Sequence, residues 1–95
     1  FDLTLIEGGQ YDRSWSYIHM TPEQSVQANL DVNGKTMMLM HWGAFTLANH
    51  GWNEPIERAL KEAKKREVNI IAPKIGETVL LGSDLHTPPT SWWDF

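Results

Sequence analysis

Hydrophobic and polar positions along the chain predict alternating strands and helices. Residues 1–7 (FDLTLIE) alternate apolar and polar side chains, which is the two-residue period of a strand. Residues 21–30 (TPEQSVQANL) begin a helix, because Thr21 can cap it, Pro22 suits its first position and Gln24 completes a capping box. Asn33-Gly34 then marks a turn. Residues 36–41 (TMMLMH) form a continuous apolar run, which suits a strand covered on both faces.

A second helix is predicted after residue 52. Asn53 is expected to cap it, with Pro55 in its first turn and the basic run KKR at its C-terminal end, where the helix dipole favours cations. Its apolar face is set by spacings of three, four and seven residues: Ile56, Ala59, Leu60 and Ala63. Acid-before-base pairs four residues apart are expected to support it: Glu54–Arg58, Glu57–Lys61 and Glu62–Arg66.

The remaining segments predict two further strands and an extended tail. VNIIAP reads as a strand ended by Pro73, and ETVLL as one more. The tail LHTPPTSWWDF cannot be helical around its two prolines, and we expect Trp92 and Trp93 to pack on the rest of the chain. The alternation predicts an α/β fold with a small, incomplete sheet and bare edges.

Composition narrows the function. A chain of 95 residues is at most one domain, and its net charge of −4 gives no basic surface for nucleic acid or anionic lipid. It has no cysteine, so disulfides and thiolate metal sites are excluded. That composition fits a cytoplasmic location, while membrane association of a longer parent protein stays open. No apolar run approaches the length of a membrane-spanning helix.

The candidate chemistry lies in MMLMHWGAFTLANHGWNEP, residues 37–55. His41 follows a predicted strand, and ligands of open α/β sheets bind at the carboxyl ends of strands. Imidazole binds zinc and similar metals, Gly43 permits a sharp turn and Trp42 can supply an apolar wall. A lone histidine after a strand is more often an ordinary core or capping residue. No second histidine has a tight motif spacing, so further ligands would be scattered or absent from this chain.

Residues 1–60 resemble the C-terminal part of a metallo-β-lactamase-fold hydrolase. The shared features are a Gly-x-Tyr turn, an aromatic segment ending in histidine, a Pro-Glu helix start, His-Trp-Gly-x-Phe and a later Glu-Pro. The branch contains the N-acylphosphatidylethanolamine-hydrolysing phospholipase D, and bacterial relatives are often labelled ascorbate-phosphate lactonase-like or outer-membrane proteins. The resemblance implies a four-layer αββα sandwich, of which this chain would be one half.

The resemblance also implies roles for individual residues. His41 would be a metal ligand, His19 a catalytic residue that meets a phosphate or leaving group, and Tyr11 and Trp42 would line the substrate pocket. The parent would hold one or two divalent ions, such as zinc, manganese or iron. It would hydrolyse a phosphodiester, phosphorylated lactone or related ester of a small-molecule or lipid-like substrate, with metal-activated water as nucleophile.

Departures from the family pattern indicate a fragment. The ligand motif His-x-His-x-Asp-His is missing, and Ala44 stands where many relatives have threonine. We therefore interpret residues 1–95 as a single C-terminal fragment, inactive and metal-free alone, whose partner is the missing N-terminal half. Isolated, it is expected to form homo-oligomers. The alternative is a small non-catalytic interaction module that self-associates through a sheet edge and its tryptophans.

Overall fold

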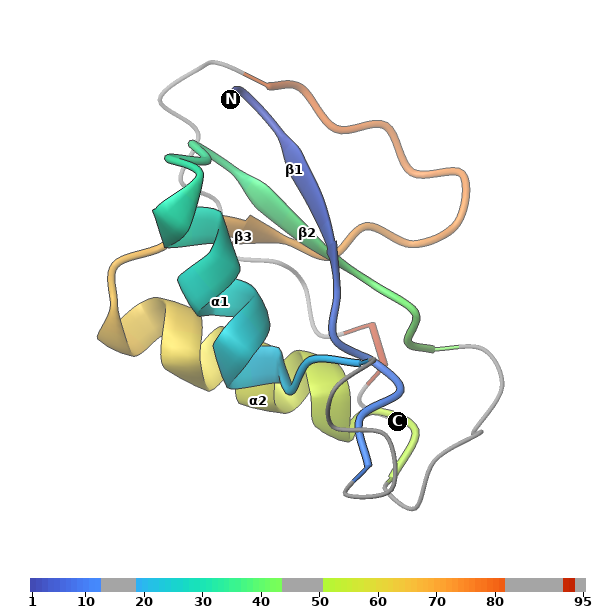
Figure 1. Ribbon diagram of the computed structural model, residues 1–95. Helices are drawn as coiled ribbons and strands as arrows, with labels where there is room; N and C mark the ends of the chain where they lie inside the picture. Colours follow the sequence, from blue (N-terminus) through green and yellow to red (C-terminus); the bar gives the residue numbers. More distant parts are fainter. Residues whose placement is uncertain (13–18, 44–50, 82–91, 94–95) are drawn as a thin grey trace.

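A computed structural model describes residues 1–12, 19–43, 51–81 and 92–93 (Figure 1). Strands and helices alternate along the chain, which confirms the predicted α/β class. Their bounds are β1 Thr4–Glu7, α1 Pro22–Asp31, β2 Met37–Met40, α2 Glu54–Lys65 and β3 Ile70–Ile71. Within the described ranges, no helix is long and apolar enough to cross a membrane.

The strands form one parallel sheet in the order β1-β2-β3. Glu7 pairs with Met40, so the carboxyl ends of β1 and β2 lie together. The two helices contact each other and lie on the same side of the sheet (Figure 1), as right-handed connections between adjacent parallel strands require. The core between these layers is built by apolar residues of β2, of β3 and the residue after it, of both helices and of the C-terminal segment: Val26, Met37, Leu39, Ile56, Ala59, Ala63, Ile70, Ala72 and Trp93.

Helix α1 begins as predicted. The Thr21 side chain accepts a hydrogen bond from the Gln24 N–H, and the Gln24 side chain accepts one from the Thr21 N–H. Pro22 occupies the first turn, where its missing N–H costs nothing. The predicted turn follows the helix, with Asn33 in the left-handed region at φ 56°.

Helix α2 packs its predicted apolar face on the core but differs from the prediction in two details. Asn53 forms no side-chain cap, because its own backbone is helical (φ −100°, ψ −1°) and not extended, so the predicted cap is wrong. No ion pair joins Glu57 to Lys61, although both are described, because Glu57 accepts a hydrogen bond from Trp93 Nε1 instead. The other predicted pairs form, at 4.0 Å for Glu54–Arg58 and 3.9 Å for Glu62–Arg66.

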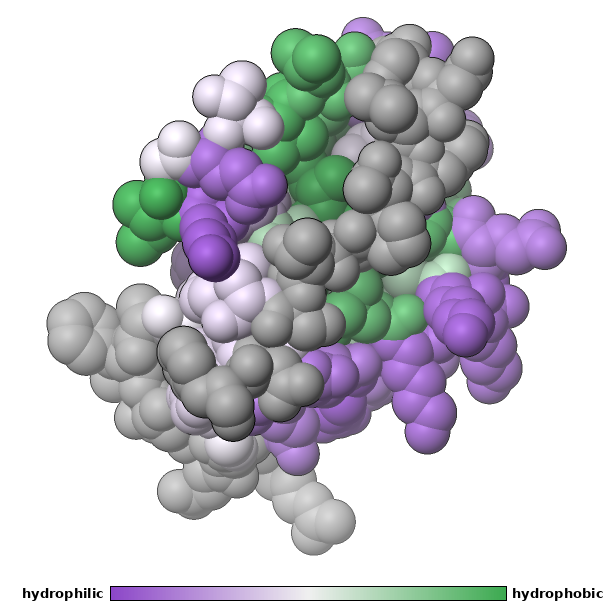
Figure 2. Space-filling model, turned by 180° about the vertical axis from the view of Figure 1, so that it is seen from behind, coloured by the Kyte–Doolittle hydropathy of each residue, from purple (hydrophilic) through white to green (hydrophobic). Residues whose placement is uncertain are grey.

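The face of the sheet opposite the helices carries an apolar row at its middle. Leu5 pairs with Met38, and Met38 pairs with Ile71, so the three side chains form one row across this face. Leu5 is 58% exposed. Figure 2 shows hydrophobic residues gathered on the back of the molecule, which is the side turned away in Figure 1. Met38 and Ile71 are half-buried. We call the row Leu5, Met38 and Ile71 the bare sheet face.

Residues 77–81 do not form the predicted strand. The chain turns at Lys74–Glu77, where the Glu77 N–H bonds the Lys74 carbonyl, and it then runs without a sheet partner in the described range. Leu80 is 74% exposed, so its apolar side chain meets no neighbouring strand. The predicted extended tail mostly lies outside the described residues. Trp92 and Trp93 do pack on the core, as predicted.

Candidate metal centre

Three potential metal ligands meet at the carboxyl edge of the sheet. Glu7 is the last residue of β1, His41 directly follows β2, and His19 lies just before α1. One donor atom from each lies within 4.8 Å of the other two. The rings of His19 and His41 are 6.2 Å apart between centroids. Parallel pairing of β1 with β2 creates this meeting point, because it brings the ends of both strands to one edge.

Glu7 is fixed by its neighbours. Its Oε1 accepts a hydrogen bond of 2.6 Å from the Met20 N–H, and its Oε2 lies 3.4 Å from His19 Nδ1. Its carbonyl accepts a hydrogen bond from Ser25 Oγ on α1. Gly8 allows this close approach, since a Cβ there would come within 2.4 Å of the Ser25 hydroxyl oxygen. The carboxylate is therefore held against the loop that carries His19.

His41 has an unusual backbone. Its φ is +67°, in the left-handed region that non-glycine residues rarely adopt, and its side chain is exposed at the edge of the sheet. The Gln10 side-chain amide donates a hydrogen bond of 3.2 Å to the His41 carbonyl. The turn continues through Gly43 at φ +77°.

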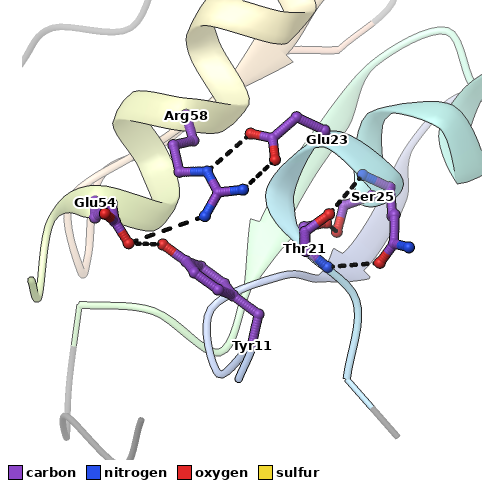
Figure 3. A network of polar contacts seen from close by, with 7 residues as sticks. Tyr11, Thr21, Glu23, Ser25, Glu54 and Arg58 are labelled. Atoms are coloured by element: carbon purple, nitrogen blue, oxygen red, sulfur yellow. Dashed lines mark hydrogen bonds and ion pairs between the residues drawn. The ribbon is translucent and has the colours of Figure 1, made fainter. Parts of the chain in front are cut away.

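Tyr11 lies in a polar network that joins both helices (Figure 3). Its hydroxyl donates to Glu54, and the Arg58 guanidinium lies 4.6 Å from its ring centroid. Arg58 also donates two hydrogen bonds to Glu23, one from Nε at 2.9 Å. Burial, with the hydrogen bond to Glu54 second, raises the pKa of Tyr11 to about 12, while the hydrogen bond to Glu23 raises the pKa of Arg58. Tyr11 thus lies between the starts of the two helices, and its predicted contact with substrate stays a prediction.

Trp42 packs inward from the turn that follows His41. It stacks on Trp92 at 5.5 Å between ring centroids and meets Trp93 edge-on at 5.6 Å. Both contacts tie the residue after His41 to the C-terminal segment. The structure therefore gives Trp42 a packing contact; its predicted contact with substrate stays a prediction.

The sequence predicted two members of the group and missed the third. His41 was predicted as a metal ligand and His19 as a catalytic residue, and the structure brings the two side chains together, while both roles stay predictions. Glu7 was overlooked because it reads as the polar end of an alternating strand. Its position at the last residue of a parallel strand beside β2 was the signal that could have found it.

Part or all of the chain is similar to known proteins. Residues 1–42, which include the whole group, match the family model of the beta-lactamase superfamily domain. The uncharacterized protein Rv0906 of Mycobacterium tuberculosis and protein Mb0930 of Mycobacterium bovis are each 43% identical over 96 residues, covering 98% of this chain and 25% of theirs. Outer membrane protein RomA of Klebsiella pneumoniae is 36% identical over 61 residues, covering 57% of this chain and 46% of its own.

The match to the beta-lactamase superfamily domain covers β1, α1 and β2 of the small α/β unit. The chain spans about a quarter of the length of the mycobacterial relatives. Metal dependence is common in the superfamily, and the Glu7–His19–His41 group is compatible with it.

Proposed function

We propose that this chain contributes the second half of a metal-dependent hydrolase site. The observation that carries the proposal is the meeting of two imidazoles and one carboxylate at the carboxyl edge of a parallel sheet. A family match that spans all three residues supports it.

The donor set suits a catalytic divalent ion. Imidazole and carboxylate groups are the ligands of many catalytic zinc and iron sites, so His41 and Glu7 could bind such an ion, with His19 beside them for contact with the substrate. Ligands about 2.1 Å from a tetrahedral ion lie about 3.4 Å from one another. The donors here lie within 4.8 Å, so small side-chain rotations at this exposed edge would bring them to bonding distance. A bound ion would supply an activated water at neutral pH and stabilise negative charge.

Each residue would have a distinct role. His41, exposed at the end of β2, would bind the ion through its neutral imidazole. Glu7 would offer Oε2 as a second donor, while Met20 keeps its other oxygen in place. His19, beside Glu7, would hold an anionic substrate oxygen or give a proton to the leaving group.

The substrate class follows from the resemblance and remains a proposal. A phosphodiester, a phosphorylated lactone or a related ester would fit, because its anionic oxygen could meet both the ion and His19. Tyr11 and Trp42 are proposed to line the pocket near this edge. The side chain of Trp42 is half-buried, which leaves part of its ring for such a contact.

The remaining ligands would come from a longer parent protein. The chain covers a quarter of its mycobacterial relatives, and the bare sheet face presents Leu5 with 58% of its surface exposed. Exposed apolar patches normally have partners. We propose that a second sheet from the N-terminal half covers this face and completes an αββα sandwich.

The test uses the full-length protein. Metal content is measured by mass spectrometry, and hydrolysis of bis(p-nitrophenyl) phosphate is followed by absorbance. His41→Ala is expected to lower both by orders of magnitude, and Glu7→Gln to lower metal affinity about 10- to 100-fold. Glu67→Gln, which neutralises an exposed carboxylate after α2, is the control and should change neither. Unaltered metal content and turnover in His41→Ala would refute the proposal.

Self-association is the second candidate function. The exposed Leu5 on the bare sheet face favours it. The tryptophan surface that it also requires is reduced, because Trp93 is 1% exposed and lies in the core. Sedimentation velocity of the isolated chain and of the full-length protein separates the two functions. An interaction module would self-associate in both contexts, whereas a hydrolase fragment would do so only when its covering half is removed.

A further inference from the structure

The backbone of His41 is held from two sides. A left-handed conformation is costly for any residue with a Cβ, and it persists only where the surroundings enforce it. On one side, the chain after β1 lies against the His41 carbonyl, which accepts the hydrogen bond from Gln10. A Cβ on Gly9 would come within 1.7 Å of that carbonyl oxygen, so the two backbones are in direct contact.

On the other side, His41 is followed by an aromatic cluster. Trp42, Trp92 and Trp93 contact one another pairwise, with ring centroids 5.5–5.6 Å apart. One pair is stacked and two are edge-to-face, the arrangements that aromatic rings prefer. We call these three residues the tryptophan clasp.

The tryptophan clasp is anchored to two elements. Trp93 is fully buried, and its Nε1 donates a hydrogen bond of 2.5 Å to Glu57 on α2. Trp92 Nε1 donates one of 2.8 Å to the Ala72 carbonyl, directly after β3. Because both indole N–H groups are bound, each ring is fixed in orientation as well as in position.

We propose that the tryptophan clasp positions the His41 imidazole. Trp42, wedged between Trp92 and Trp93, fixes the peptide that follows His41, while Gly9 and Gln10 fix its carbonyl. The backbone torsion of His41 determines where its side chain points, so the clasp keeps the ring beside His19 and Glu7. Trp93, 52 positions beyond His41, is then a positioning residue of the site that the proposed function describes.

The test compares Trp93→Phe and Trp42→Phe with Trp52→Phe in the full-length protein. Trp52 is 37% exposed and lies outside the clasp, so it is a matched control. The first readout needs no metal: an NOE between the ring protons of selectively labelled His19 and His41, whose centroids are 6.2 Å apart. The second is Co²⁺ affinity from its absorption bands.

We expect Trp93→Phe and Trp42→Phe to abolish the NOE and to weaken Co²⁺ binding about 10-fold. Trp52→Phe should retain both. If Trp93→Phe does not fold, Trp92→Phe, at a half-buried position, replaces it. If these variants keep the NOE and the Co²⁺ affinity but unfold at a lower midpoint, the proposal is overturned, because the clasp would then be only structural. A wild-type protein that binds no Co²⁺ would refute the metal-dependent function. Loss of the NOE in Trp93→Phe would still support the clasp in that case.

Discussion

A methyl group at Gly9 should disrupt the end of the sheet and the candidate site together. Its Cβ would come within 1.7 Å of the His41 carbonyl oxygen and 2.6 Å of the Trp42 nitrogen. Both of these are backbone atoms, so no side-chain rotation relieves the overlap. The chain after β1 would have to move away from the turn after β2.

The size of the effect follows from these distances. A carbon–oxygen contact is normally about 3.3 Å, so the chains must separate by about 1.6 Å. Such a shift breaks the hydrogen bond from Gln10 to the His41 carbonyl, now 3.2 Å long. Overpacking costs about 1–3 kcal/mol and a lost hydrogen bond about 1 kcal/mol, so Gly9→Ala should lower the free energy of unfolding by about 2–4 kcal/mol.

Urea unfolding followed by circular dichroism measures this loss. Gly51→Ala is the control, because its added Cβ would have its nearest neighbours at 3.8 and 4.0 Å, an ordinary contact distance. It should change the free energy of unfolding by less than about 0.5 kcal/mol. The reasoning is refuted if Gly9→Ala is as stable as Gly51→Ala.

Three further predictions concern other parts of the molecule. Tyr11 has its pKa raised from 10.0 to about 12, so its neutral form stabilises the fold below pH 10 and this contribution is lost as pH rises through 12. Stability measured between those pH values should fall more steeply in the wild type than in Tyr11→Phe; parallel curves would contradict this. Asn29, fully buried, accepts a hydrogen bond of 2.6 Å from the Thr4 hydroxyl. Asn29→Ala should cost about 2 kcal/mol by urea unfolding, and a loss below about 0.5 kcal/mol would show that the bond matters little. Leu5→Lys, on the bare sheet face, should reduce self-association of the isolated chain in sedimentation velocity. An unchanged association constant would show that the interface lies elsewhere.

Local signals in the sequence were enough for the two helices and for the alternation of the first three strands with them. The capping box at Thr21 and the apolar spacing of α2 are interactions between near neighbours, so they can be identified without the rest of the fold. The Asn53 cap failed because its geometry depends on how the preceding turn enters the helix. The strand predicted at residues 77–81 failed because a strand requires a partner, and its sequence does not show whether one is present.

The candidate site was only partly accessible from sequence. His19 and His41 could be identified from residue type and motif. Glu7 could not be recognised as their neighbour without the pairing of β1 with β2. Likewise, the spacing of Trp42 and Trp93 gives no indication that their rings meet.

The amino-acid pattern alone determined the α/β class, the helix starts and an imidazole at the end of a strand, because those features depend on local conformation and burial. Tertiary structure alone decided the meeting of the three candidate ligands, the left-handed backbone of His41 and the aromatic contacts behind it. These features join segments far apart in the chain, and only the folded sheet brings such segments to one edge.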